Sequence, residues 1–171
     1  MTVTRNALVR HSGVRRGIAL GSLALVLLCH AASAEWTVQR LRDPATKVEV
    51  CHLVSETVTM RDGYETTMVS VAFTGKAILV RTASPLDVSF NDIGVQVDRH
   101  PLVAMDTTQE RKIAVFTTGY ATLVEQSKKG ARLRVQLRFW PTWPATGTHD
   151  ATFQLKGFTK AYAEMLTCQK G

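Results

Sequence analysis

Apolar and polar residues alternate over much of this chain, which is the pattern of β-strands that bury one face. The clearest segment is residues 131–139, where the odd-numbered positions are apolar and the even-numbered positions are Arg or Gln. Further strands are predicted between Gly, Pro, Asn and Asp breaks, at residues 36–41, 47–60, 64–73, 76–82, 86–90, 93–98, 102–105, 111–118 and 151–155. The Asp62-Gly63 pair between two of these runs indicates a tight hairpin.

Two segments follow a helical period instead. Tyr120, Leu123 and Val124 share one face of a helix predicted over residues 120–129, and Gly130 follows its end. A second helix is predicted over residues 158–166, with Cys168 at its end. The short strands, the frequent turns and the lack of a repeat or linker predict one mainly β domain over residues 35–171. We expect an antiparallel β-sandwich or barrel-like sandwich with two short helices, the last one at the C-terminus.

Residues 1–34 have a different pattern, which is typical of a secretory signal peptide. A basic region from Arg5 to Arg16 precedes an apolar run of 12 residues, and small residues follow at Ala32 and Ala34. We expect cleavage after Ala34 and a mature chain in the periplasm or outside the cell. A membrane anchor is the alternative, but 12 helical residues span about 18 Å, well short of the roughly 30 Å hydrocarbon core.

Two other export signals have partial matches in this region. Arg15-Arg16 resembles a twin-arginine signal, but Gly17-Ile18-Ala19 follows in place of the usual bulky apolar residues and lysine. Cys29 follows two leucines, whereas lipoprotein processing favours a small residue before the cysteine. No later stretch approaches 18 apolar residues, so we do not expect the mature chain to be an integral membrane protein.

Composition narrows the class of protein. The 171 residues are 45% hydrophobic and 20% charged, which excludes a disordered, collagen-like or polytopic membrane protein. The net charge of +7 includes four arginines in residues 1–34, so residues 35–171 carry 17 Lys and Arg against 14 Asp and Glu, a net +3. This modest charge and the predicted export argue against a nucleic-acid partner.

Cleavage would leave two cysteines, Cys51 and Cys168. An even number in an exported chain favours one disulfide between them. A redox pair or metal ligands are the alternatives, but the two cysteines lack both the C-x-x-C spacing of redox sites and a zinc-like spacing.

Residues 153–161 (FQLKGFTKA) form a strand that runs through Gly-Phe into a terminal helix. Together with Trp36-Thr37-Val38, Cys51 and the Ile93–Asp98 strand, they resemble the invasion-associated locus B family. That family comprises small exported bacterial proteins with a β-sandwich core. The resemblance implies this fold and compartment, and it carries no catalytic residues to transfer.

The chain departs from that family in two places. Residues 98–119 contain no cysteine where the family has a further pair, and the segment 140–144 (WPTWP) is not a family feature. The resemblance covers about a third of the mature chain, so a role in cell invasion is not carried over.

Sequence motifs for catalysis are absent. The chain has no G-x-S-x-G, P-loop or G-x-G-x-x-G motif, and His52, His100 and His149 are far apart in sequence. His149-Asp150 could be half of a metal site or a His–carboxylate pair, but residues 147–150 are more typical of an exposed turn. His52 and His100 are more simply structural. No cofactor or metal is predicted, and we do not expect an enzyme.

Two features are candidates for binding. Arg132, Arg134 and Arg138 lie on the polar face of one strand, where alternate residues are about 7 Å apart. They form either a basic face for an anionic partner or a solvated outer face. Trp140 and Trp143, stiffened by neighbouring prolines, are either binding anchors or rings that cover the end of the sandwich.

The sequence therefore predicts an exported, non-catalytic binding or accessory protein. Its predicted binding residues are Arg132, Arg134, Arg138, Trp140 and Trp143, and its partner is an unknown protein or an anionic component of the cell envelope. The alternative is a small periplasmic enzyme with His149 or His100 in a pocket.

Overall fold

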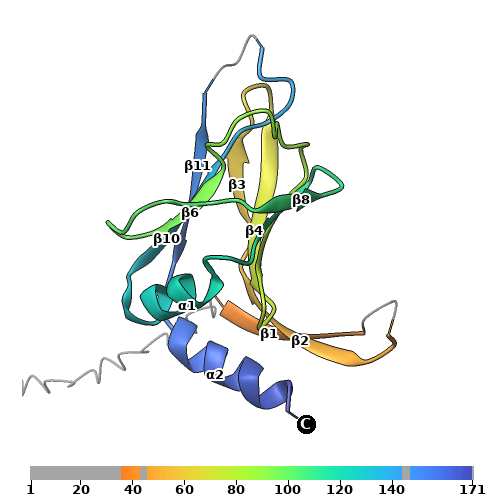
Figure 1. Cartoon of the computed structure of the whole chain (residues 1–171), viewed down its shortest axis with the longest axis vertical. Helices are drawn as coiled ribbons and strands as arrows, with labels where there is room; N and C mark the ends of the chain where they lie inside the picture. Colours follow the sequence, from red (N-terminus) through yellow and green to blue (C-terminus); the bar gives the residue numbers. More distant parts are fainter. Residues whose placement is uncertain (1–35, 43–45, 144–146, 171) are drawn as a thin grey trace, which may run out of the picture. The chain divides into compact units, whose positions relative to one another are not determined.

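The computed structural model describes residues 36–42, 46–143 and 147–170 (Figure 1). The predicted signal peptide, residues 1–34, lies outside this part of the chain.

Within the described residues, two antiparallel sheets are present. The first has the order β1-β2-β4-β5-β9-β8, with β3 paired to β4; its strands are β1 (Trp36–Arg42), β2 (Glu49–Ser55), β3 (Val58–Arg61), β4 (Thr66–Phe73), β5 (Ile78–Thr82), β8 (Thr107–Gln109) and β9 (Ile113–Phe116). The second has the order β11-β10-β6-β7, with β6 (Gly94–Val97), β7 (Val103–Ala104), β10 (Arg132–Leu137) and β11 (His149–Gln154).

The two sheets form a sandwich around one hydrophobic core. Phe73 and Ile78 from the first sheet and Leu133 and Phe153 from the second are at most 1% exposed and belong to the same buried cluster. Most strands contribute alternate residues to this cluster, although β8 contributes none, so the period-two pattern seen in the sequence is the core pattern. The predicted fold class, a mainly β antiparallel sandwich with two short helices, is confirmed.

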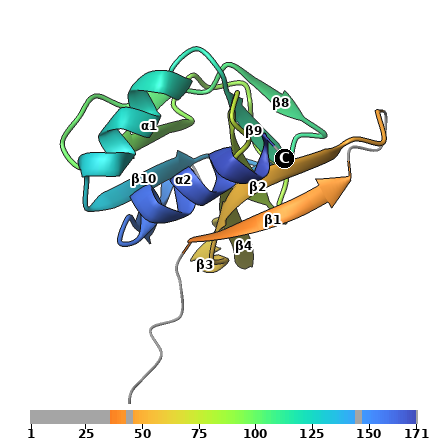
Figure 2. The ribbon, with the colours of Figure 1, turned by 90° about the horizontal axis from the view of Figure 1, so that it is seen from below.

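The helices α1 (Tyr120–Lys129) and α2 (Phe158–Cys168) lie at the same end of the sandwich (Figures 1 and 2). Phe158 begins α2 and packs its ring edge-on against Trp36 and Phe73, at centroid distances of 5.1 and 4.9 Å. A disulfide joins Cys51 in β2 to Cys168 at the end of α2, as predicted. The helix is therefore held at both of its ends.

The sequence prediction was wrong in two segments. Residues 86–90 form only a single bridge, Leu86 to Phe139, because the Asp87 side chain accepts the backbone N–H of Ser89 at 3.0 Å and turns the chain. His149 and Asp150 are not an exposed turn but the first residues of β11, where His149 pairs with Leu137 of β10.

Two other segments differ from the sequence prediction. The long segment 47–60 is two strands, β2 and β3, separated by Glu56 and Thr57. The strand β8 had no signal in the sequence, because its residues Thr107–Gln109 are all polar and it is defined by its pairing with β9.

Candidate functional site

The structure places the five predicted binding residues in two groups, one in the first half of β10 and the other beyond its far end. Arg132 and Arg134 lie in the first half of the strand, whereas Arg138, Trp140 and Trp143 follow its far end. At about 3.3 Å per residue, Arg132 and Trp140 are separated by roughly 26 Å. Arg138 is therefore the arginine that adjoins the tryptophans.

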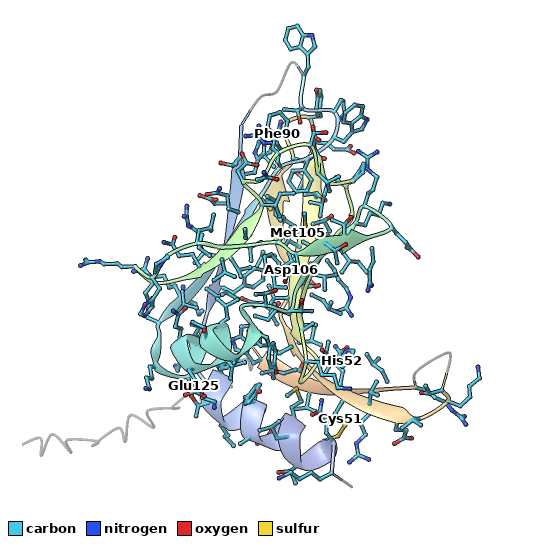
Figure 3. All side chains as sticks on the ribbon, in the orientation of Figure 1. Cys51, His52, Phe90, Met105, Asp106 and Glu125 are labelled. Atoms are coloured by element: carbon cyan, nitrogen blue, oxygen red, sulfur yellow. A yellow bond between two sulfur atoms is a disulfide. The ribbon has the colours of Figure 1, made fainter. Side chains whose placement is uncertain are left out.

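Four aromatic side chains are exposed at the end of the sandwich that lies away from the helices. We call Tyr64, Phe90, Trp140 and Trp143 the aromatic end; their exposed fractions are 45%, 43%, 53% and 77%. They come from three separate segments: the β3–β4 turn, the connection after β5 and the loop after β10. Figure 3 shows Phe90 near this tip. The interpretation that the two indoles cover the core is wrong, because both remain largely open to solvent.

Contacts between these segments hold the loops that carry the exposed rings. The hydroxyl of Tyr64 donates to the carbonyl oxygen of Trp143 at 2.6 Å, and the backbone N–H of Trp140 donates to the carbonyl oxygen of Pro85 at 2.9 Å. The guanidinium of Arg111 lies 5.3 Å from the centre of the Trp140 ring, within cation–π range. The aromatic end is thus a connected surface built by segments far apart in sequence.

The guanidinium of Arg138 is already paired with a carboxylate of the protein. Its Nε donates to both carboxylate oxygens of Asp92 at 3.1 Å, its Nη2 also contacts Asp92, and its guanidinium lies 4.2 Å from the centre of the Phe90 ring. The hydrogen bonds from Arg138 to Asp92 raise the pKa of the guanidinium. With only 13% of its side chain exposed, Arg138 positions Phe90 and is not a free cation for a ligand.

Two buried carboxylates brace the aromatic end, and the sequence reasoning missed both. Asp62 accepts the backbone N–H groups of Tyr64 and Glu65 at 2.9 and 2.8 Å and the hydroxyl of Ser84 at 2.6 Å. Burial acts to raise the pKa of Asp62, but the hydrogen bonds from Ser84 and from the backbone outweigh burial and hold that pKa below its usual value. The Asp-Gly hairpin was a usable signal for Asp62.

The second carboxylate, Asp87, accepts a hydrogen bond from the hydroxyl of Thr142 and another from the backbone N–H of Ser89. Burial acts to raise the pKa of Asp87, and these hydrogen bonds outweigh it, so the pKa is lowered. Since Thr142 lies between the two tryptophans, Asp87 ties their loop to the connection that carries Phe90. No sequence signal links these two residues, which are 55 positions apart.

The first half of β10 presents the other two arginines. Arg134 donates from Nε to Gln96 at 2.9 Å and from Nη1 to Asp150 at 3.1 Å. The Arg132 guanidinium has no hydrogen-bonding or ionic partner in the described part of the chain, and it lines a pocket of about 320 Å³ together with Arg134 and Arg99. The sequence did not point to Arg99, because this residue lies in the connection between β6 and β7, far from β10 along the chain.

The histidines do not form a catalytic arrangement in the part of the chain that is described. The His100 side chain is exposed, and the ring of His149 lies 5.9 Å from that of Phe139. The Nδ1 atom of His52 is buried without a hydrogen-bond partner; burial, and then the charge of Arg81, lowers the pKa of His52. Among the described residues, no three His, Cys, Asp or Glu side chains are grouped to hold a metal ion.

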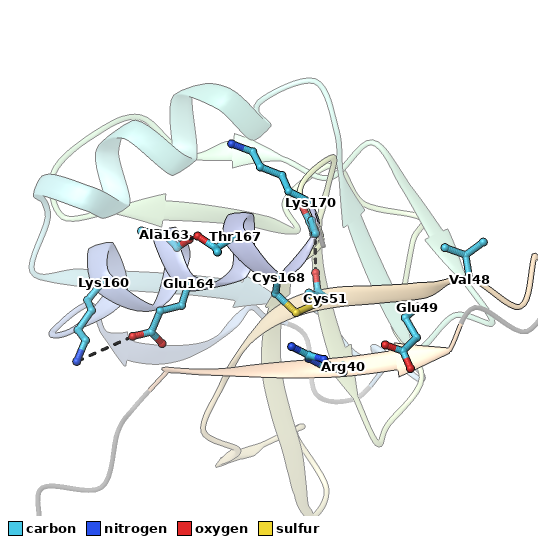
Figure 4. Close-up of a pocket in the computed structure, with 11 residues that line it drawn as sticks. Arg40, Val48, Glu49, Cys51, Lys160, Ala163, Glu164, Thr167, Cys168 and Lys170 are labelled. Atoms are coloured by element: carbon cyan, nitrogen blue, oxygen red, sulfur yellow. Dashed lines mark hydrogen bonds and ion pairs between the residues drawn. A yellow bond between two sulfur atoms is a disulfide. The ribbon is translucent and has the colours of Figure 1, made fainter.

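A groove of about 880 Å³ lies between α2 and the β1–β2 pair (Figure 4). The Cys51–Cys168 disulfide forms part of its wall. Its charged residues have both signs: Arg40, Lys160 and Lys170 against Glu49 and Glu164. The Lys160 amine and the Glu164 carboxylate are 3.9 Å apart, so part of this charge is already paired.

None of the helices in the described residues has the length and apolar character needed to cross a bilayer.

No family model matches the chain. A comparison with curated proteins likewise finds no significant match. Among solved structures, the chain is similar to invasion associated protein B from Bartonella henselae, with a TM-score of 0.54 and 19% sequence identity. The match covers 80% of this chain and 95% of that one. At this identity the similarity establishes a shared fold, so the resemblance read from the strand-to-helix segment at residues 153–161 is confirmed for the fold.

Proposed function

We propose that this chain is exported, loses residues 1–34 and acts in the periplasm or outside the cell as a non-catalytic binding or accessory protein. The signal-like N-terminus and the Cys51–Cys168 disulfide support export, because disulfides persist in oxidising compartments. The similar fold belongs to a protein named as invasion associated, which is in keeping with a role at the cell envelope.

The observation that carries the binding role is the exposure of Trp140 and Trp143 on a braced surface. Leaving two indoles 53% and 77% exposed forgoes the stabilisation that burial of such large apolar side chains provides. Trp, Tyr and Arg are the residues enriched where protein interfaces concentrate their binding energy. The aromatic end and the neighbouring Arg111 present these residue types on loops that hydrogen bonds hold in place. The partner that binds the aromatic end is a protein of the cell envelope.

The alternative, a periplasmic enzyme with a histidine pocket, gains no support in the described residues. Neither His100 nor His149 is hydrogen-bonded to a carboxylate there, although each has a defined position in the fold.

Site-specific photo-crosslinking tests this proposal in cells that produce the protein. A photoreactive phenylalanine analogue replaces Trp143 in one variant and Met68 in a matched control, because Met68 is 58% exposed but lies on β4, outside the aromatic end. We expect a discrete protein adduct from position 143 and none from position 68. An excess of purified wild-type protein should compete for that adduct, and Trp140→Ala/Trp143→Ala protein should not.

The proposal is overturned if both positions give the same adducts or if neither gives one. An adduct with lipid in place of protein would assign the aromatic end to a membrane surface, and this outcome would also overturn a protein partner.

A further inference from the structure

Three strands of the second sheet bring polar side chains to one place on its outer face. Arg134 of β10 pairs in register with Gln96 of β6 and with Thr152 of β11. Residues directly paired in an antiparallel sheet point to the same face, so these three side chains are neighbours. The β6–β7 connection adds Asp98 and Arg99, and the start of β10 adds Arg132. Five of these residues, together with Ala131, line the pocket of about 320 Å³.

The positive charge in this pocket is only partly neutralised by the protein. Arg99 and Arg132 have no hydrogen-bonding or ionic partner within the described ranges, in contrast to Arg138, which Asp92 neutralises. Arg134 uses Nε and Nη1 for Gln96 and Asp150, and its Nη2 makes no hydrogen bond to a described residue. A guanidinium has five N–H donors in a planar fork. The pocket therefore holds several unused donors that face one space.

The carboxylate that lines this pocket, Asp98, is directed to the backbone. Its two oxygens accept the N–H groups of Ala131 and Arg132, each at 3.0 Å, and its own N–H donates to the carbonyl oxygen of Arg132 at 3.0 Å. These three bonds fix the start of β10 against the β6–β7 connection. Asp98 thereby positions the backbone that carries both Arg99 and Arg132.

Close packing also holds the α1–β10 connection against Asp98. A Cβ atom at Gly130 would lie 2.8 Å from the Asp98 carboxylate and 2.5 Å from a methyl group of Val97. Only glycine fits at that distance, so the approach of the α1–β10 connection to Asp98 depends on Gly130.

We propose that this pocket binds the phosphate group of a phosphomonoester or phosphodiester. Three guanidinium groups and the Thr152 hydroxyl suit the tetrahedrally arranged oxygens of a phosphate ester better than the two coplanar oxygens of a carboxylate. A volume of about 320 Å³ is roughly ten times the share of one water molecule, so the pocket has room for a phosphate and part of the group that carries it. This site is separate from the aromatic end.

Calorimetric titration of the oxidised mature protein at constant ionic strength tests the inference. The probes are glycerol phosphate, inorganic phosphate and acetate. We expect saturable binding of glycerol phosphate, at least tenfold weaker binding of acetate, and at least a tenfold loss in an Arg99→Gln/Arg132→Gln variant. The control Arg40→Gln/Arg42→Gln removes the same charge from exposed positions on β1 and should bind as the wild type does.

A third variant, Arg132→Lys, keeps the charge but removes the planar fork, and it should bind more weakly than the wild type. Vesicles containing phosphatidylglycerol identify the source of the phosphate. Binding to them that depends on Arg99 and Arg132 assigns a lipid headgroup, and binding of glycerol phosphate alone assigns a soluble compound.

Equal weakening by both double variants, equal binding of acetate and phosphate, or no saturable binding of any phosphate probe would each overturn this inference. The crosslinking experiment at position 143 does not involve these arginines, so it reports on the proposed function independently.

Discussion

Single side chains of the same type have opposite roles in this protein. Trp36 is 3% exposed, donates its ring N–H to the carbonyl oxygen of Gln154 at 2.7 Å and packs edge-on against Phe158, so it belongs to the core. Trp140 and Trp143 lie outside the core on braced loops. A buried indole stabilises the fold, whereas an exposed one is available to a partner. The same contrast separates Arg138, which has its own carboxylate, from Arg132, which has none in the described residues.

Asp62→Ala should lower the free energy of unfolding by about 1–3 kcal/mol at pH 7, because three hydrogen-bond donors would lose their acceptor. The lowered pKa of Asp62 adds a pH dependence. Its stabilisation is fully present above the unfolded-state pKa of about 3.9 and is lost as the pH falls through the lower folded-state pKa. The difference between wild type and variant should therefore shrink in acid.

Urea denaturation from pH 7 to pH 2 measures this difference. Glu56→Ala is the control, since Glu56 is exposed and should change the free energy of unfolding by less than about 0.5 kcal/mol. A difference between wild type and Asp62→Ala that persists unchanged at pH 2 would contradict the role given to the ionised carboxylate.

Among the elements, α2 depends most clearly on contacts outside itself. Gln169, just after the helix, donates from Nε2 to the carbonyl oxygens of Cys51 and Thr74 at 2.8 and 2.9 Å. The disulfide then joins residues 117 positions apart in sequence, so it restricts nearly the whole domain in the unfolded state.

The double variant Cys51→Ala/Cys168→Ala should lower the free energy of unfolding by about 4–5 kcal/mol, the chain-entropy value for a loop of this length. Urea denaturation of the variant and of the oxidised wild type measures this loss. Hydrogen exchange should show the largest loss of protection in α2. Wild-type protein that has been reduced and alkylated is a second form without the disulfide. If either form without the disulfide is as stable as the oxidised protein, the stabilising role given to the disulfide is contradicted.

For the molecule as a whole, we expect export to keep the cysteines oxidised. The mature chain should begin at Glu35, with Cys51 and Cys168 joined and no free thiol, because cleavage also removes Cys29. Intact mass of protein recovered from producing cells, alkylated with and without prior reduction, checks all three points. Retention of residues 1–34, or two thiols that alkylate without reduction, would contradict the predicted compartment.

The period-two pattern of β10 and the helix over residues 120–129 could be predicted from the sequence because local periodicity alone specifies them. The disulfide could be predicted because removal of the expected signal peptide leaves two cysteines. The turn at residues 86–90 and the all-polar strand β8 could not be predicted. The turn depends on the hydrogen bond that the Asp87 side chain accepts from the backbone N–H of Ser89, and β8 depends on its pairing with β9.

The site shows the same division. The amino-acid sequence alone is enough to identify the unusual residues, which are the arginines on one face of β10 and the two tryptophans after it. Their surroundings follow from the folded structure: Asp92 neutralises Arg138, Arg132 shares a pocket with Arg99, and the two tryptophans are exposed to solvent. The physical reason is that burial and charge pairing depend on neighbours brought in by other strands, and their distance along the chain leaves no local pattern to read.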